Sequence, residues 1–155
     1  MKCWVAILAA VAIPTPGLAR ENLGVFGRWA AFRDAGASRC YAISEPLRTH
    51  PKARWRGFAS IGTWPGRARN QLHIRIHQAR APGTRLLLRI GRQRFPLVVG
   101  GADAWAPDAR TDAAVVAAMR SAERMWVGGD TYILRGAASA IDAAALGCVS
   151  NRGTR

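Results

Sequence analysis

The stretch from Trp55 to Val99 constrains the fold more than any other part of this chain. It contains four apolar-rich runs, which are Trp55–Thr63, Gln71–Ala79, Thr84–Ile90 and Gln93–Val99. The runs are separated by Pro65-Gly66, Pro82-Gly83 and Gly91-Arg92. These dipeptides favour tight turns, because proline presets φ and glycine accepts the positive φ that such turns need. Connections this short place consecutive strands side by side and antiparallel, so the stretch predicts a four-stranded meander.

Side chains along Gln71–Ala79 alternate between apolar and basic, which is the period of a β-strand. Three apolar residues fall on one face and three basic residues on the other, namely Leu72, Ile74 and Ile76 against His73, Arg75 and His77. The sheet is therefore expected to have an apolar face toward the core and a basic outer face.

Shorter strand patterns flank the meander, at Val25–Phe32, Arg39–Ser44, Arg124–Val127 and Thr131–Leu134. Apolar residues at helical spacing predict a helix over Thr111–Ala122, and a second over Ser139–Leu146. Ser139 and Asp142 form a capping-box pattern for that second helix, and Gly147 is placed to end it. We expect a mainly β fold, an antiparallel β-sandwich or half-barrel with one late inserted helix and a short C-terminal helix. Residues 149–155 are expected to be a disordered tail.

Residues 1–19 have the features of a secretory signal peptide. Lys2 is positively charged, Cys3–Ile13 is apolar, and Gly17-Leu18-Ala19 offers small residues for cleavage. A permanent anchor is the alternative, but eleven apolar residues are too few for a bilayer core of about 30 Å. We expect cleavage after Ala19 and a single β-rich domain over residues 20–148, periplasmic or secreted, without a transmembrane segment.

Cleavage would leave Cys40 and Cys148 as the cysteines of the exported chain. An even pair in an oxidising compartment predicts a disulfide, with two buried free thiols as the alternative. Two cysteines without a CxxC spacing do not build a zinc site.

The net charge is +14, with 23 basic against 9 acidic residues. One interpretation is an anionic partner, such as lipid headgroups, envelope polysaccharide or nucleic acid, although no specific nucleic acid is expected. The other is compositional, because arginine greatly outnumbers lysine in a chain rich in alanine and glycine, as a GC-rich coding bias would produce. The candidate anion-binding residues share strand faces by even spacing, and they are His73, Arg75, His77, Arg85 and Arg89. The alternative for these residues is a solvated outer face.

No motif for catalysis, a metal or a cofactor stands out. His73 and His77 would lie about 13 Å apart on a strand, too far for one ion. Ser60 lacks the G-x-S-x-G spacing of a nucleophile elbow. We therefore expect a chain that is not an enzyme and needs no cofactor, with a small periplasmic hydrolase as the alternative. Most tryptophans are expected to pack in the core, and Trp64 beside its turn is expected to be exposed, where it could stack on sugars or bases.

Several short motifs follow one another along the chain. They are Gly27-Arg28-Trp29, Cys40-Tyr41-Ala42, and Leu134-Arg135-Gly136 before the Ala-rich Ala140–Leu146. This arrangement resembles the invasion-associated locus B family of exported proteobacterial proteins, especially a short relative in sphingomonad-type bacteria. The resemblance implies an exported β-rich domain with a C-terminal helix, linked in some members to host-cell invasion or the envelope. It implies no catalytic residues. The expected function is thus a non-enzymatic cell-envelope protein that binds an anionic surface or a protein partner.

Overall fold

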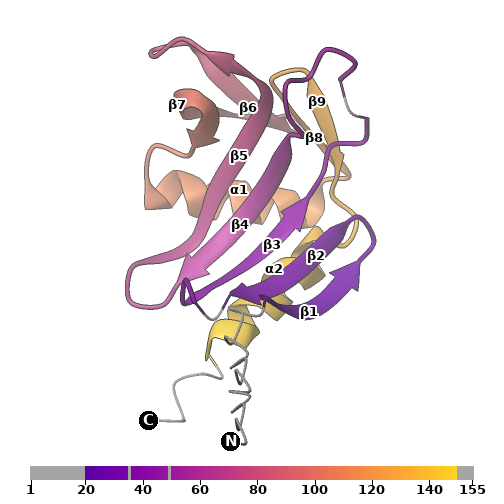
Figure 1. The fold of residues 1–155 in the computed structure, drawn as a ribbon, viewed down its shortest axis with the longest axis vertical. Coiled ribbons are helices and arrows are strands. Elements are labelled where there is room, and N and C mark those ends of the chain that lie inside the picture. The colour runs from indigo at the N-terminus through magenta and orange to yellow at the C-terminus, as the bar shows by residue number, and fades with distance from the viewer. Residues whose placement is uncertain (1–19, 35, 49, 150–155) are drawn as a thin grey trace, which may run out of the picture.

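The computed structural model describes residues 20–34, 36–48 and 50–149. Within these ranges the chain forms a nine-stranded sheet, open at both edges, with the strand order β1-β2-β3-β4-β5-β7-β6-β8-β9. The strands are β1 (Arg20–Phe26), β2 (Trp29–Asp34), β3 (Arg39–Ser44), β4 (Phe58–Trp64), β5 (Ala68–Arg80), β6 (Leu86–Ile90), β7 (Gln93–Trp105), β8 (Arg124–Val127) and β9 (Asp130–Ile133). Helices α1 (Ala109–Ser121) and α2 (Ala137–Val149) lie behind the sheet in the view of Figure 1. The predicted mainly antiparallel β class, with one late helix and one closing helix, is confirmed.

The four strands of the predicted meander do not lie in the sheet in their order along the chain, because the sheet order is β4-β5-β7-β6. β4 pairs with β5, and β6 with β7, as their tight turns predict. β5, however, pairs with the far half of β7 and not with β6. The reason is that β7 continues beyond the predicted run Gln93–Val99, through Gly100-Gly101 to Trp105. Gly101 has a φ of +65°, and such a residue lets a strand bend, so one strand pairs with β6 first and with β5 afterwards.

The N-terminal part contains a hairpin where the sequence indicates one strand. Val25–Phe32 is divided between β1 and β2, which pair antiparallel across Gly27-Arg28. Gly27 has a φ of +61°, which a non-glycine residue rarely adopts. The predicted strand Arg39–Ser44 has the same bounds as β3. The predicted strands Arg124–Val127 and Thr131–Leu134 correspond to β8 and β9, which pair antiparallel.

The core lies between the inner face of the sheet and the two helices. Leu72, Ile74 and Ile76 of β5 are fully buried, as the alternation predicts. Val115 and Met119 of α1 are buried against the same core. The curved sheet therefore has an inner face covered by α1 and α2, and an outer face on which neither of these two helices packs (Figure 1).

Helix α2 is longer than predicted at both ends. It begins at Ala137, so Ser139 does not cap it, and Asp142 instead forms an ion pair with Arg120 of α1. It also continues through Gly147 to Val149, where the sequence predicts a stop. A Cβ on Gly147 would come within 2.5 Å of Leu23 Cδ1, so this glycine allows β1 to pack closely on the helix.

The predicted disulfide is present. Cys40 of β3 and Cys148 of α2 are bonded, with their Cα atoms 5.7 Å apart. The bond ties the C-terminal helix α2 to the beginning of β3. No helix among the described residues is long and apolar enough to cross a membrane. The predicted signal peptide at residues 1–19, and residues 150–155 of the predicted tail, lie outside the described residues.

Candidate functional site

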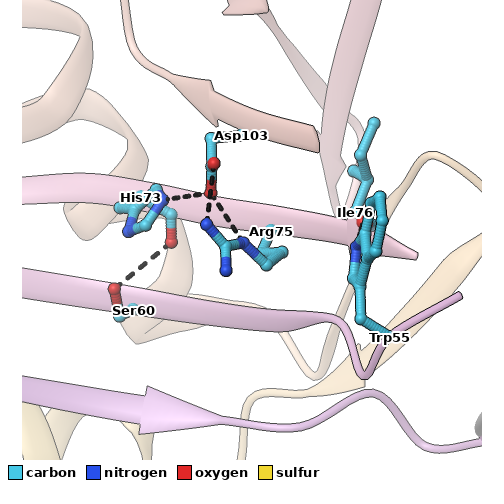
Figure 2. A network of polar contacts seen from close by, with 6 residues as sticks. All are labelled: Trp55, Ser60, His73, Arg75, Ile76 and Asp103. Carbon is cyan, nitrogen blue, oxygen red and sulfur yellow. Dashed lines mark hydrogen bonds and ion pairs between the residues drawn. The ribbon is translucent and has the colours of Figure 1, made fainter. Parts of the chain in front are cut away.

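His73 and Arg75 lie together on the outer face of β5, where both contact Asp103 of β7 (Figure 2). Arg75 Nε and Nη2 donate to Asp103 Oδ1 and Oδ2 at 2.9 Å each. His73 Nε2 lies 2.8 Å from Oδ1. The hydrogen bond from Arg75, and then that from His73, lowers the pKa of Asp103. These two predicted anion-binding residues therefore already share an internal anion.

The same cluster contains the residue types of a hydrolytic triad without its geometry. Ser60 of β4 lies directly opposite His73. Its hydroxyl donates to the His73 main-chain carbonyl at 3.3 Å, whereas a triad needs the hydroxyl to donate to the imidazole. The His73 ring instead stacks on Trp105, with ring centroids 5.4 Å apart. The arrangement supports a structural network better than the hydrolase alternative.

His77 does not continue this outer face. The pairing of β5 with β7 is irregular between Arg75 and Arg80, and both Ile76 and His77 are buried. His77 Nδ1 lies 3.1 Å from both carboxylate oxygens of Asp130, and its ring stacks on His50 with centroids 4.5 Å apart. Nearby, the Trp55 indole donates to the Ile76 carbonyl at 2.7 Å (Figure 2). The expected face of evenly spaced basic residues therefore ends at Arg75.

Arg85 and Arg89 lie on a different part of the sheet, around β6. Leu86, Leu88 and Ile90 face the core, so the residues between them face outward. Register places Arg89 directly opposite Arg94 of β7 on one side and Trp126 of β8 on the other. The Arg89 guanidinium lies 4.3 Å from the centroid of the Trp126 ring.

We call this outer surface the hairpin face. Its strand residues share the side of β6, β7 and β8 that points away from the core, and they are Leu87, Arg89, Arg94, Pro96, Val98, Arg124 and Trp126. We include Arg85, which is exposed and immediately precedes β6. All are exposed except Trp126, which is half-buried. This face differs from the predicted set of binding residues. It combines Arg85 and Arg89 of that set with two further arginines and a tryptophan.

The arginines of the hairpin face have no carboxylate partner within the described ranges. Six of the chain's nine carboxylates form ion pairs, all with side chains elsewhere. Asp108 caps α1, and Asp112 accepts a hydrogen bond from the Leu72 amide. The remaining carboxylate, Glu123, precedes β8 and is exposed. The positive charge of this face is thus left for solvent or for a ligand.

Part of this face could be read from the sequence. The two-residue turn Gly91-Arg92 sets Ile90 opposite Gln93, which in turn sets Arg89 opposite Arg94. Trp126 joins through the pairing of β6 with β8, which is distant in sequence. No local pattern indicates that pairing, so the sequence reasoning missed Trp126 and Arg124.

Three cavities among the described residues lie away from these clusters. Cavities of about 530, 480 and 470 Å³ are each lined without a histidine. The cavity of about 530 Å³ is beside the disulfide, between the β4–β5 turn and the end of α2, at Cys148. In the described part of the chain, no three His, Cys, Asp or Glu side chains gather as metal ligands would.

Comparison with family models, with curated proteins and with solved structures gives no match for this chain. The resemblance to the invasion-associated locus B family therefore stays a prediction.

Proposed function

We propose that this chain is an exported, non-enzymatic protein of the cell envelope that binds an anionic surface through the hairpin face. The supporting observation is a contrast between two groups of arginines. Arg75 is held by Asp103 in a two-pronged ion pair. Arg89 and Arg94 lie opposite one another, and neither forms an ion pair with a carboxylate in the described part of the chain.

This arrangement favours an anion for a physical reason. Like charges placed directly opposite on neighbouring strands repel, at a cost of about 0.2–1 kcal/mol. An anionic group held between Arg89 and Arg94 would remove that repulsion and replace it with charge-assisted hydrogen bonds. Guanidinium groups suit this role because their planar fork matches phosphate, sulfate and carboxylate oxygens.

The envelope location is supported by two features. The first nineteen residues read as a signal peptide, and the Cys40–Cys148 disulfide is of the kind that persists in oxidising compartments. The resemblance to the invasion-associated locus B family points the same way. A basic, disulfide-bonded protein in that compartment would meet anionic lipids and polysaccharides.

Retention on immobilised heparin, followed by elution with salt, tests the binding proposal. The double variant Arg89→Ala with Arg94→Ala should elute at clearly lower salt than wild type, because it lacks two of the charges that would hold heparin at this face. Salt weakens such contacts, since exposed charges are screened over about 8–10 Å at physiological ionic strength. The matched control is Arg28→Ala with Arg67→Ala, which removes two exposed arginines from turns elsewhere. Elution of both double variants at the same salt concentration would contradict the proposal, since retention would then follow net charge alone.

A further inference from the structure

The hairpin face carries exposed apolar side chains among its arginines. Leu87 is 53% exposed and Val98 is 54% exposed. Outward positions of a half-buried antiparallel sheet are ordinarily polar. Leu87 and Val98 therefore need a different explanation from the arginines around them.

The apolar and basic residues form neighbouring rows across the strands. Leu87 lies directly opposite Pro96, which gives an apolar row. The adjacent row contains Arg94, Arg89 and Trp126, on β7, β6 and β8. Such rows lie about 7 Å apart, since every second residue on a strand faces the same way. Both kinds of side chain can thus touch one flat surface together.

Resting on the proposed function above, we propose that the anionic surface is a lipid bilayer with anionic headgroups. The arginines contact headgroup phosphates, while Leu87, Val98 and the Trp126 ring enter the interfacial region. Arginine can bury its aliphatic stem and keep its charge at the headgroups, and tryptophan favours the membrane interface. A soluble polyanion would account for the arginines alone and would leave Leu87 and Val98 without a role.

Charge complementarity gives the expected size of the electrostatic part. Each arginine near an anionic membrane strengthens binding by about 5-fold. Removing Arg89 and Arg94 together should therefore weaken partitioning onto anionic vesicles by about 25-fold. Replacing Leu87 and Val98 with serine should weaken partitioning by about 10-fold or more, because apolar area no longer leaves water.

The test is co-sedimentation of the exported chain with vesicles. One set contains phosphatidylcholine with one third phosphatidylglycerol, and the other contains phosphatidylcholine alone. Wild type should sediment with the anionic vesicles at low salt, with a blue shift of tryptophan emission that Trp126→Phe reduces. The double variant Leu87→Ser with Val98→Ser should bind the anionic vesicles much more weakly than wild type, while its retention on heparin should equal that of wild type.

A matched control removes one valine and one leucine from other exposed positions. Val25 is 67% exposed on β1 and Leu146 is 70% exposed on α2, so Val25→Ser with Leu146→Ser should bind vesicles like wild type. Equal vesicle binding by the Leu87/Val98 variant and wild type would overturn the bilayer inference and leave the anion-binding proposal standing. Failure of wild type on both heparin and anionic vesicles would overturn the two proposals together.

Discussion

Asp112 offers a sharp test of how the sheet and α1 are joined. Its side chain is 6% exposed and accepts a hydrogen bond from the Leu72 amide of β5 at 2.8 Å. Burial raises the pKa of this carboxyl, and nearby Asp108 adds to the effect. The carboxylate therefore provides a hydrogen-bond acceptor for the buried Leu72 amide, but its negative charge is unfavourable because the side chain is buried.

Two variants separate these contributions. Asp112→Ala leaves the Leu72 amide buried without an acceptor, which should cost about 1–3 kcal/mol in the free energy of unfolding. Asp112→Asn keeps an oxygen in place and removes the charge. Losing the buried charge stabilises the fold, whereas losing the interaction with the α1 dipole costs about 0.3–1 kcal/mol. The Asn variant should therefore lie within about 1 kcal/mol of wild type at pH 7, well above the Ala variant.

The pH dependence has a definite sign. A pKa that is higher in the folded state than the ordinary value of 3.8 means that protonation of Asp112 favours folding. That stabilisation is present at low pH and is lost as the pH rises through the folded-state pKa. Relative to Asp112→Asn, wild type should therefore gain stability as the pH falls toward 3.8.

Urea unfolding followed by circular dichroism, at pH 7 and near pH 4, measures both effects. An Asn variant as unstable as the Ala variant at pH 7 would contradict the role of the Asp112 side chain as a hydrogen-bond acceptor. A loss of stability of wild type relative to the Asn variant on acidification would contradict the expected effect of protonation.

Three further predictions concern the disulfide, Gly136 and the predicted signal peptide. Cys148→Ser should lower the free energy of unfolding by up to about 4–5 kcal/mol, since the disulfide closes a loop with a sequence separation of 108 residues. The urea midpoints of oxidised wild type and of the variant measure this loss, and equal midpoints would contradict it. Gly136→Ala should destabilise by about 1–3 kcal/mol or more, because Gly136 has a φ of +93° and an added Cβ would lie 2.0 Å from the Phe26 carbonyl oxygen. Gly66→Ala is its control, with a positive φ but nothing within 4 Å, so an equal loss in both variants would refute the role of the clash. Mass spectrometry of the exported form should show Arg20 as its first residue, and an intact Met1 on a membrane-bound product would exclude cleavage after Ala19.

The elements set by local pattern could be predicted from the sequence. The alternation around Ile74 correctly predicted which side of β5 is buried, and the even cysteine pair predicted the bond between β3 and α2. These succeed because side-chain period and redox chemistry depend little on distant residues.

The features that failed depend on contacts distant in sequence. The bend at Gly101 sends β7 across to β5, which no turn dipeptide indicates. His77 is buried beside Asp130, which comes from a hairpin far along the chain and lies 3.1 Å from His77 Nδ1. Gly147 reads as a helix stop, yet it is needed for the approach of Leu23.

The candidate site was half predictable for the same reason. Arg85 and Arg89 could be chosen from spacing, and Arg94 could have been added from the turn between β6 and β7. The neutralisation of Arg75 by Asp103 required knowledge of the β5–β7 register. Charge counted along the sequence could not distinguish a paired arginine from an unpaired one.

The central claim is that the hairpin face, and not the overall charge, contacts the anionic surface. Modification of arginines by phenylglyoxal, read by peptide mass spectrometry with and without anionic vesicles, measures this contact residue by residue. We predict protection of Arg85, Arg89 and Arg94 on vesicle binding, with Arg28 and Arg67 modified as in the free protein. Equal protection of all five arginines, or protection of Arg28 and Arg67 alone, would contradict the claim.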